Sequence, residues 1–312
     1  MAARARPPMI RRSPFVIAAL LAGTTLTAGQ TTTFKSGVEA VRLDVSVMRG
    51  GQPVRGLSAD DFLVTDNKVP QRVEGVAIEL LPLSVFLVLD TSGSVAGEKL
   101  SHLIDAGKTL VGALHPTDRA ALITFSADVT VRVGLTSDLQ AITAALGAIE
   151  GRGPTAIRDA VHLALQLRPD DESRPVVLVF TDGQDTSSWL SASDVMASAR
   201  RSGVVIHAVS LVEQQTKIVE AGQPSLQPDS PATAFLERLV AATGGRHWPA
   251  AASGDLRPLF VRALDEMRAR YLLSFYPQGV TREGGHDLKV TLKRGRGDVT
   301  ARPGYFVPSS RN

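Results

Sequence analysis

Four segments of this chain are almost uniformly apolar, and they constrain the fold more than any other feature. Their side chains do not alternate between apolar and polar, which is typical of strands buried on both faces in a parallel sheet. Segments with helical periodicity separate them, and strands alternating with helices predict a doubly wound α/β domain. The four apolar segments are SVFLVL (84–89), AALITF (120–125), PVVLVF (175–180) and GVVIHAV (203–209).

The helical segments between these strands place their apolar residues on one side, as amphipathic helices do. The expected fold is therefore α/β, with a mostly parallel, Rossmann-like sheet. Between Glu213 and Pro231 the chain is rich in Gln, Pro, Ser and Gly, which predicts a surface loop. The apolar residues that define the helices are Leu100, Leu103, Ile104, Gly107, Val111 and Leu114, then Ile157, Val161, Ala164 and Leu165, then Phe235, Leu236, Leu239 and Val240, and finally Leu256, Phe260, Ala263, Leu264 and Met267.

Segments with a β pattern lie on both sides of the α/β region. Near the start, VRLDVSV (41–47) alternates between apolar and polar residues, and DFLVTDNKVPQRV (61–73) predicts a hairpin around Asp66-Asn67. After Arg270 the β pattern returns in YLLSFYP, HDLKVTLKR and VTARPGYFV. We expect these flanks to pair into a small accessory β domain. The expected boundaries are 31–82 and 271–312 for the flanks, and 83–270 for the α/β domain.

The first thirty residues predict an export signal. Four arginines without any acidic residue precede the short apolar run FVIAALLAG, and small and polar residues follow it. Cleavage is expected near Ala28 to Gln30, with an uncleaved anchor as the alternative. Removing the four arginines changes the formal net charge from +3 to −1, so no net basic field remains to attract a nucleic acid. We expect a secreted, periplasmic or envelope-associated protein without an integral membrane span after signal removal. The sequence does not define its oligomeric state.

Cysteine is absent from the chain. This excludes disulfides, thiolate metal sites, cysteine nucleophiles and the lipid anchor of a lipoprotein. A metal site in this protein must therefore use oxygen or nitrogen ligands.

Polar side chains follow two of the apolar strands and one further turn. Asp90, Ser92 and Ser94 come at the end of the first apolar strand, Asp182 follows the third, and Thr155 lies at a turn that opens a helix. We expect all five on the rim formed by the carboxyl ends of the strands, where ligands of such sheets bind. Two carboxylates and three hydroxyls suit a hard divalent cation, with Mg²⁺ first and Mn²⁺ or Ca²⁺ as alternatives.

The charge of this ligand set also bears on function. Two carboxylates neutralise a divalent cation without exceeding its charge, so the ion stays electrophilic and can accept an acidic ligand from outside. A set of four carboxylates would repel such a ligand.

The motifs DTSGS, GPTAIRDA and TDGQD, in this order, resemble the metal-ion-dependent adhesion site (MIDAS) of von Willebrand factor A domains. The resemblance covers roughly Leu83 to Arg270 and implies direct metal binding by Ser92 and Ser94. It implies that Thr155 and the two aspartates, Asp90 and Asp182, bind directly or through water. The flanks are similar to exported bacterial proteins called VWFA-related, known largely from Acidobacteria, which mostly lack an assigned function.

Structural readings compete with parts of this pattern. A Ser-rich helix N-cap gives the same letters as Asp-x-Ser-x-Ser, and Thr155 could cap a helix as well as bind a metal. Asp159 and Asp185 are interpreted as solvated or capping acids. Ser94 lacks the nucleophile elbow of a hydrolase, and no His-Glu-x-x-His motif occurs. The Arg-Gly-Asp of GRGDV (295–299) is interpreted as a basic turn. A C-terminal set of basic residues is interpreted as a solvated face: Lys289, Lys293, Arg294, Arg296 and Arg302.

The leading functional hypothesis is an adhesion-type binding module rather than an enzyme. Its metal would complete its coordination with a Glu or Asp carboxylate of a partner protein. One alternative is an enzyme or enzyme subunit in which the cation polarises a phosphoryl or carbonyl oxygen. Another is an envelope scaffold in which the metal only holds loops together. By analogy with related domains, the helix around Leu256 to Arg270 could move with the metal site.

Overall fold

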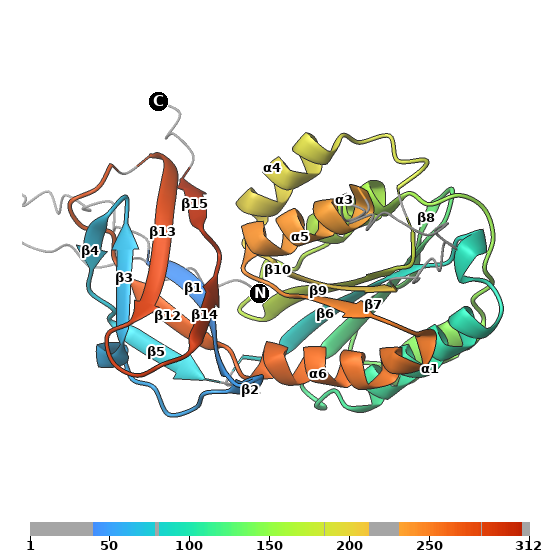
Figure 1. The fold of residues 1–312 in the computed structure, drawn as a ribbon, viewed down its shortest axis with the longest axis horizontal. Helices are drawn as coiled ribbons and strands as arrows, with labels where there is room; N and C mark the ends of the chain where they lie inside the picture. Colours follow the sequence, from blue (N-terminus) through green and yellow to red (C-terminus); the bar gives the residue numbers. More distant parts are fainter. Residues whose placement is uncertain (1–39, 79–80, 184, 212–230, 282, 308–312) are drawn as a thin grey trace, which may run out of the picture. The chain divides into compact units, whose positions relative to one another are not determined.

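The computed structural model describes residues 40–78, 81–183, 185–211, 231–281 and 283–307, all within one compact unit, Val38–Asn312. The predicted export signal and residues 213–230 of the predicted polar loop lie outside the described residues, so both remain predictions. The order of the elements along the chain is shown by colour in Figure 1.

The larger sheet has the strand order β11-β10-β9-β6-β7-β8. Its strands pair in parallel, except that β8 runs antiparallel to β7 at one edge. The four apolar segments of the sequence form β6, β7, β9 and β10, so the predicted mostly parallel sheet is confirmed. The strands are β6 (Leu83–Asp90), β7 (Arg119–Phe125), β8 (Val129–Thr136), β9 (Arg174–Thr181), β10 (Val205–Leu211) and β11 (His247–Ala250).

Helices cover both faces of this sheet (Figure 1). One face packs against α1 (Glu98–Gly112), α2 (Leu139–Gly147) and α6 (Leu256–Arg268), and the other against α3 (Ile157–Gln166), α4 (Ala192–Ser202) and α5 (Pro231–Thr243). This arrangement confirms the predicted doubly wound class.

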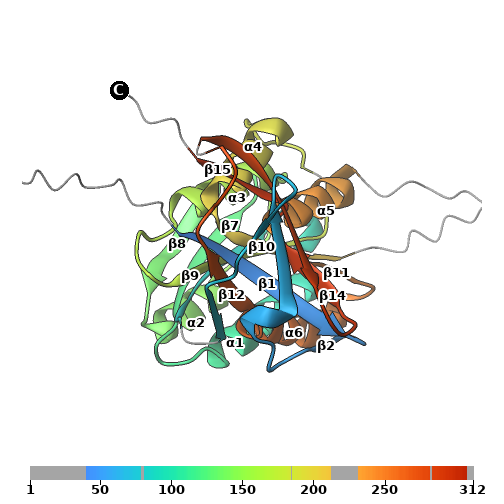
Figure 2. The ribbon, with the colours of Figure 1, turned by 90° about the vertical axis from the view of Figure 1, so that its left-hand side faces the viewer.

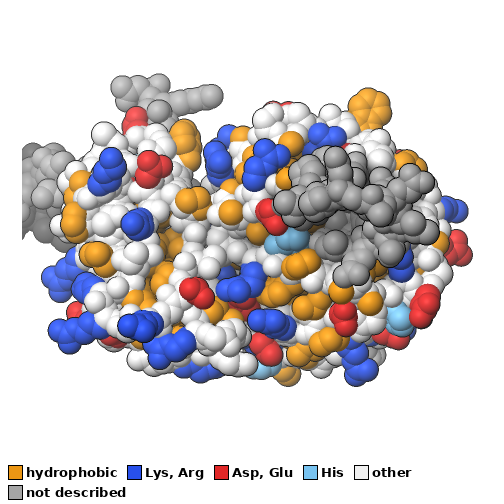
Figure 3. Space-filling model, viewed as in Figure 1, with side chains coloured by type: hydrophobic (Ala, Val, Ile, Leu, Met, Phe, Trp, Pro, Cys, Tyr) orange, Lys and Arg blue, Asp and Glu red, His pale blue; other side chains and the backbone are white. Residues whose placement is uncertain are grey.

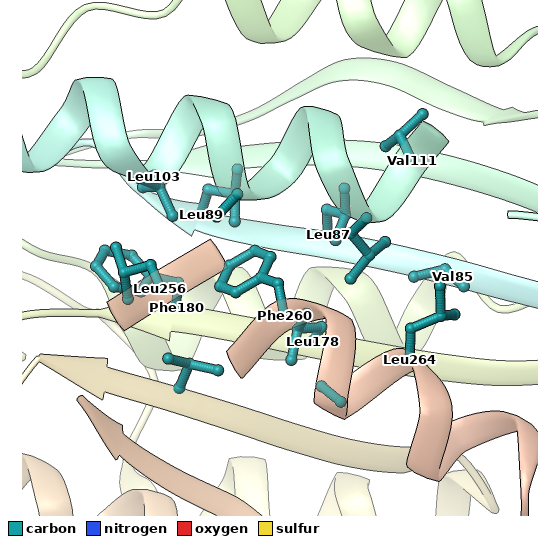
Figure 4. Packing of buried hydrophobic residues seen from close by; sticks show 14 of the residues in the cluster. Val85, Leu87, Leu89, Leu103, Val111, Leu178, Phe180, Leu256, Phe260 and Leu264 are labelled. Carbon is teal, nitrogen blue, oxygen red and sulfur yellow. The ribbon is translucent and has the colours of Figure 1, made fainter. Parts of the chain in front are cut away.

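The central strands lack alternation because successive side chains enter two different hydrophobic cores. Along β6, Val85, Leu87 and Leu89 face α1 and α6, while Phe86 and Val88 face the opposite helices. Figure 4 shows how tightly the first of these cores is packed. It labels Leu103 and Val111 of α1, Leu178 and Phe180 of β9, and Leu256, Phe260 and Leu264 of α6 around the β6 side chains.

The segments before and after the α/β region pair with each other. From the N-terminal segment, β1 pairs with β12 and β14, and β3 pairs with β13. All three pairings are antiparallel (Figures 1 and 2). They form two small sheets with the orders β14-β1-β12-β5, where β2 also pairs with β1, and β15-β13-β3-β4. The strands are β1 (Val41–Arg49), β2 (Gln52–Pro53), β3 (Phe62–Asp66), β4 (Val69–Gln71), β5 (Gly75–Ile78), β12 (Tyr271–Phe275), β13 (Gly284–Leu292), β14 (Asp298–Ala301) and β15 (Gly304–Val307).

The hairpin predicted at Asp66-Asn67 forms between β3 and β4, one residue further along the chain. Asn67 and Lys68 are its central residues, with φ angles of 47° and 69°. Positive φ at both central positions matches the right-handed twist of the flanking strands, and Asn tolerates it well. The first three residues of GRGDV, Gly295 to Gly297, connect β13 to β14, whereas Asp298 and Val299 begin β14.

Arg302 was predicted to lie on a solvated face, and this prediction is wrong. It is partly buried, its Nη2 donates a hydrogen bond of 2.8 Å to the carbonyl of Arg42, and its guanidinium carbon lies 5.8 Å from the centre of the Tyr305 ring. The pattern of basic residues misled because the β13–β15 strands turn this arginine inward. Lys289, Lys293, Arg294 and Arg296 are exposed as predicted.

Three short 3-10 helices complete the described elements, at Ala59–Asp61, Gly93–Val95 and Ser253–Asp255. The second of them, η2 (Gly93–Val95), immediately follows the end of β6 and shapes the first loop of the candidate metal site.

Candidate metal site

Asp90 is the last residue of β6 and is completely buried. Its Oδ1 accepts a hydrogen bond of 2.8 Å from the Ser92 backbone N–H, and its Oδ2 accepts one of 2.6 Å from the Thr181 hydroxyl. Thr181 ends β9, the neighbouring parallel strand, so Asp90 joins the two strand ends that carry the predicted ligands. The alternative in which Ser92 caps a helix with its side chain is not observed, because its side chain makes no capping bond to η2.

Ser92, Ser94 and Asp182 form a continuous set of oxygens across the two loops. The Ser92 and Ser94 hydroxyls lie 3.1 Å apart, and Ser94 Oγ donates a hydrogen bond of 2.7 Å to Asp182 Oδ1. Ser94 is exposed while Ser92 is buried, so the set opens to solvent on the side of Ser94. The structure thus brings these three predicted residues into contact, with Asp90 held directly behind them.

Thr155 lies in the adjacent loop and is buried. Two backbone hydrogen bonds hold this loop against the first one: Gly93 N–H to the Gly153 carbonyl at 2.9 Å, and Arg152 N–H to the Thr91 carbonyl at 2.8 Å. Gly153 has a φ of 82°, a left-handed conformation that glycine adopts without strain. The loop that carries Thr155 is therefore held against the loop that carries Ser92 and Ser94. Among the described residues, Thr155 forms no direct hydrogen bond to the other predicted ligands.

The capping alternative for Thr155 is wrong. Helix α3 has Ala156 as its N-cap residue, and the N–H groups of its first turn donate to Ser188 and Asp185 instead of Thr155. The backbone of Thr155 instead binds the loop after β9: its N–H donates to the Thr186 hydroxyl at 2.9 Å, and its carbonyl accepts from the N–H groups of Thr186 and Ser187. The Thr155 hydroxyl is left available for a different role.

Lys99 belongs to this site and was missed by the sequence analysis. It lies in the first turn of α1, and its ammonium is 3.1 Å from Asp182 Oδ2. The Asp182 side chain is 1% exposed and that of Lys99 26%, so the pair is largely shielded from water. A lysine at the start of a helix that follows the first ligand loop is the only signal the sequence offered.

Asp159 and Asp185 have structural roles, as interpreted from the sequence. Asp159 accepts hydrogen bonds from the backbone N–H groups of Trp189 and Leu190, at 2.8 and 2.9 Å. Asp185 pairs with Arg158 at 3.0 Å and accepts bonds from the backbone and hydroxyl of Ser188. Both acids are occupied in ordering the loop after β9.

The electrostatics of the site favour a bound cation. Burial raises the pKa of Asp90, its hydrogen bonds with Ser92 and Thr181 oppose that change, and the neighbouring charge of Asp182 raises the pKa further. Two carboxylates placed this close, one of them without solvent, repel each other. A cation between or beside them relieves this repulsion, and the Lys99 ammonium already does so for Asp182.

The donor set and its spacing fit a small, hard divalent ion. Within the described residues no group of three or more His, Cys, Asp and Glu residues could hold a metal, so any ion here depends on the hydroxyls. Adjacent ligands of an octahedral ion with bonds of about 2.0–2.1 Å lie about 2.9 Å apart. The spacings of 3.1 Å for Ser92 to Ser94 and 2.7 Å for Ser94 to Asp182 bracket this value. A Mg²⁺-sized ion could therefore replace these hydrogen bonds with little movement.

Comparison with known proteins identifies the domain that carries this site. Residues 85–184 match the family model described as the von Willebrand factor type A domain, and this range includes all five predicted ligands. The chain contains a von Willebrand factor type A domain. The more specific likeness to bacterial VWFA-related proteins remains a prediction.

Relatives and solved structures share this domain at low identity. A stretch of 131 residues is 28% identical to inter-alpha-trypsin inhibitor heavy chain H4 of Sus scrofa, covering 38% of this chain and 14% of the relative. A stretch of 109 residues is 31% identical to an uncharacterised Synechocystis protein, covering 34% of this chain and 26% of the relative. The chain thus spans about a quarter or less of each of these proteins.

Two solved structures show the same fold. A von Willebrand factor type A protein from Catenulispora acidiphila has a TM-score of 0.50 at 12% identity, covering 85% of this chain and 76% of that one. Proximal thread matrix protein 1 from the mussel byssus, with a zinc-occupied MIDAS motif, has a TM-score of 0.50 at 20% identity, covering 64% and 48%.

Proposed function

We propose that this protein is an exported, divalent-cation-dependent binding module whose ion coordinates an acidic residue of a partner protein. Ser92 and Ser94 bind the ion directly, Thr155 and Asp182 directly or through water. Asp90, whose two carboxylate oxygens already accept hydrogen bonds from Ser92 and Thr181, contributes through water. The observation that carries the proposal is the unbroken oxygen set from Ser92 through Ser94 to Asp182 at the strand ends.

The ion we propose is Mg²⁺, with Mn²⁺ as a close substitute. Mg²⁺ requires near-ideal octahedral geometry with bonds of about 2.0–2.1 Å, and the spacings of the Ser92, Ser94 and Asp182 oxygens fit adjacent ligands of such an ion. Calcium takes six to eight oxygens at about 2.3–2.6 Å in a more flexible geometry. It would therefore need more ligands, from water or from other residues, than Mg²⁺ or Mn²⁺.

The position of the opening supports an external ligand. The exposed Ser94 lies on the solvent side, whereas Asp90 and Ser92 are buried behind it. With two carboxylates, the ion and the Lys99 ammonium, the occupied site would have a net charge of +1, so a third carboxylate from a partner meets no electrostatic barrier. The binding of that carboxylate directly to the ion, in a site partly shielded from water, would supply much of the affinity.

The comparisons support metal binding at the level of the domain. The mussel structure named above has a zinc-occupied MIDAS motif, which is a property of that protein. We extend metal binding to this chain because its own oxygens have suitable spacing. Export is proposed from the first thirty residues of the sequence. Within the described part of the chain, no helix has the length and apolar character needed to cross a membrane.

A binding role fits the site better than catalysis. No histidine takes part in the hydrogen bonds that the described site residues form with one another. The two nearby acids that are not predicted ligands, Asp159 and Asp185, already accept hydrogen bonds from backbone N–H groups and from the Arg158 side chain. A general base would need a free titratable group within hydrogen-bond reach of the reacting atoms. We therefore propose that the protein is not an enzyme.

The experiment that tests the function is a selection of displayed random peptides. Immobilised protein is loaded with Mg²⁺, and bound peptides are eluted with EDTA. We expect the selected peptides to contain Asp or Glu, and each to lose binding when that residue is changed to Asn or Gln. Ser94→Ala, which removes one exposed ligand and leaves the buried Asp90 in place, should abolish binding while the fold is retained.

Two results would contradict the proposal. Peptides that bind equally well in EDTA would show a surface independent of the metal. Metal-dependent binding that survives exchange of every acid in the peptide for its amide would show that the ion stabilises the loops without contacting the ligand.

A further inference from the structure

Trp189 is the most exposed large hydrophobic side chain among the described residues. It is 95% exposed, whereas the other five exposed large hydrophobic residues are between 39% and 51% exposed. On the face drawn in Figure 3, hydrophobic side chains are interspersed with charged ones, as on most soluble proteins. A tryptophan left almost entirely in water is unusual against this background, because its large apolar surface gains much from burial.

The backbone that carries Trp189 is held firmly. The N–H groups of Trp189 and Leu190 donate to the two carboxylate oxygens of Asp159, at the start of α3. Ser188 accepts bonds from the N–H groups of Arg158 and Asp159, and its own N–H donates to Asp185. These bonds fix the backbone. A partner that binds the indole would therefore lose less affinity to loop ordering than one that binds a mobile loop.

The same loop is tied to the candidate metal site. Thr186, three residues before Trp189, bonds through both its hydroxyl and its N–H to the backbone of Thr155. Asp182, the predicted ligand that follows the last residue of β9, is seven residues before Trp189. Trp189 therefore belongs to the loop that packs on the backbone of Thr155 and begins at Asp182.

The acids around the indole do not offer a second charged contact. Asp159 and Asp185 already accept hydrogen bonds at both carboxylate oxygens, from Trp189, Leu190, Arg158 and Ser188. Neither of these two acids is therefore free to add a charged contact to a cationic partner residue placed over the indole. The surface instead favours an apolar or aromatic side chain.

We infer that Trp189 is a second anchor of the binding surface, which packs against an apolar or aromatic side chain adjacent in the partner to the metal-binding acid. This inference rests on the proposed function and specifies the partner: a segment that presents a carboxylate and a bulky apolar side chain a few residues apart. Tryptophan is among the residues that contribute most when an interface buries them.

The test uses EDTA-eluted peptides selected from a random library on Mg²⁺-loaded full-length protein. Their affinities are measured for wild type, Trp189→Ala and Trp189→Phe. Phe306→Ala is the matched control, since it removes an aromatic side chain of β15 that is 51% exposed. We expect Trp189→Ala to weaken binding about 30-fold, Trp189→Phe less, and the control not at all. Mg²⁺ affinity and thermal stability should be unchanged in all three variants.

Fluorescence gives an independent readout. The chain has two tryptophans, and the other, Trp248, is buried. Binding of a selected peptide should shift the emission to shorter wavelength and protect it from iodide quenching in wild type, but not in Trp189→Ala.

The possible failures are distinguishable. Metal-dependent peptides that bind wild type and Trp189→Ala equally would overturn the inference and leave the proposed function standing. Selected peptides with an acid but no recurrent apolar neighbour would also overturn it. If the library yields no metal-dependent peptide although Mg²⁺ binds, the proposed function is contradicted and the inference falls with it.

Discussion

The ammonium of Lys99 lies 3.1 Å from Asp182 Oδ2, while the hydroxyl of Ser94 lies 2.7 Å from Asp182 Oδ1. Both oxygens of this carboxylate are thus engaged from within the chain. Asp182 is a predicted metal ligand, so its lysine partner occupies the side chain that the ion would use. The protein therefore supplies an internal cation that balances the site before metal binding.

Replacing Lys99 with Met should strengthen metal binding. The change removes a positive charge close to the ion and frees Asp182. The repulsion between this charge and the ion is felt at an effective dielectric of about 20, because the groups are partly shielded from water. We expect Mg²⁺ affinity to rise by about tenfold, together with a lower melting temperature of the metal-free protein. Lys108→Met, on the same helix, is the control for loss of one charge. Weaker Mg²⁺ binding in Lys99→Met would show instead that the lysine orders the site for the ion.

Glu266 links the last helix to the buried Arg270 and to the partly exposed Arg246. Its carboxylate lies 2.8 Å from Arg246 Nε and 3.7 Å from Arg270 Nη1, contacts that are ion pairs by distance without the angle of a hydrogen bond. The side chains of Glu266 and Arg270 are 2% and 1% exposed. Glu266→Ala would leave the buried Arg270 without its carboxylate partner and should lower the free energy of unfolding by about 3–5 kcal/mol.

Chemical denaturation measures this loss. The control is Asp265→Ala, which removes an exposed acid from the neighbouring position of α6 and should change stability by less than about 0.5 kcal/mol. Equal effects of the two substitutions would show that the buried ion pairs do not stabilise the fold.

Tyr305 should make the β domain sensitive to alkaline pH. Burial, followed by its hydrogen bond of 2.6 Å to the fully buried Asp66, raises the pKa of Tyr305 well above its usual value. In the unfolded chain a tyrosine ionises near pH 10. Between these values the folded state binds more protons, so stability falls as the pH rises above about 10.

Urea unfolding at pH 8 and pH 11 tests this sign. Tyr305→Phe should reduce stability at pH 8 by about 1–3 kcal/mol, because Asp66 loses a partner, and should lose less stability than wild type between the two pH values. Tyr276→Phe, at an exposed position, should behave like wild type. An unchanged pH dependence in Tyr305→Phe would contradict the assignment.

The parts of the fold with strong local signals could be predicted from the sequence. The four central strands were recognisable because both their faces are buried, and α1, α3, α5 and α6 because each has a clear apolar side. By contrast, α2, α4 and β8 were not predicted. In α4 only Val195 and Ala199 are buried, so its pattern resembles a polar loop. β8 is an edge strand with no fully buried residue, and its pairing with β7 depends on contacts distant in sequence.

The candidate site shows the same division. The sequence showed the spacing of Asp90, Ser92 and Ser94, and it showed Asp182 directly after an apolar strand. The structure brings the oxygens of Ser92, Ser94 and Asp182 together. Lys99 was not visible as a member, since a lysine in the first turn of an amphipathic helix is usually solvated. Its role depends on the direction of α1 relative to β9, which no local pattern encodes. Trp189 is similar, because exposure of a tryptophan cannot be predicted from its neighbours in the chain.

The central claim is that Asp182 and its neighbours bind a divalent cation. The most direct measurement is a calorimetric titration of the mature protein with Mg²⁺ and Mn²⁺, beside Asp182→Asn and Asp105→Asn. The first variant keeps the size of the side chain but removes a ligand charge, and the second removes an exposed acid elsewhere on α1. Saturable binding to one site in wild type and Asp105→Asn, lost in Asp182→Asn, is the predicted result. Equal binding in all three proteins, or no binding of either ion to wild type, would contradict the account.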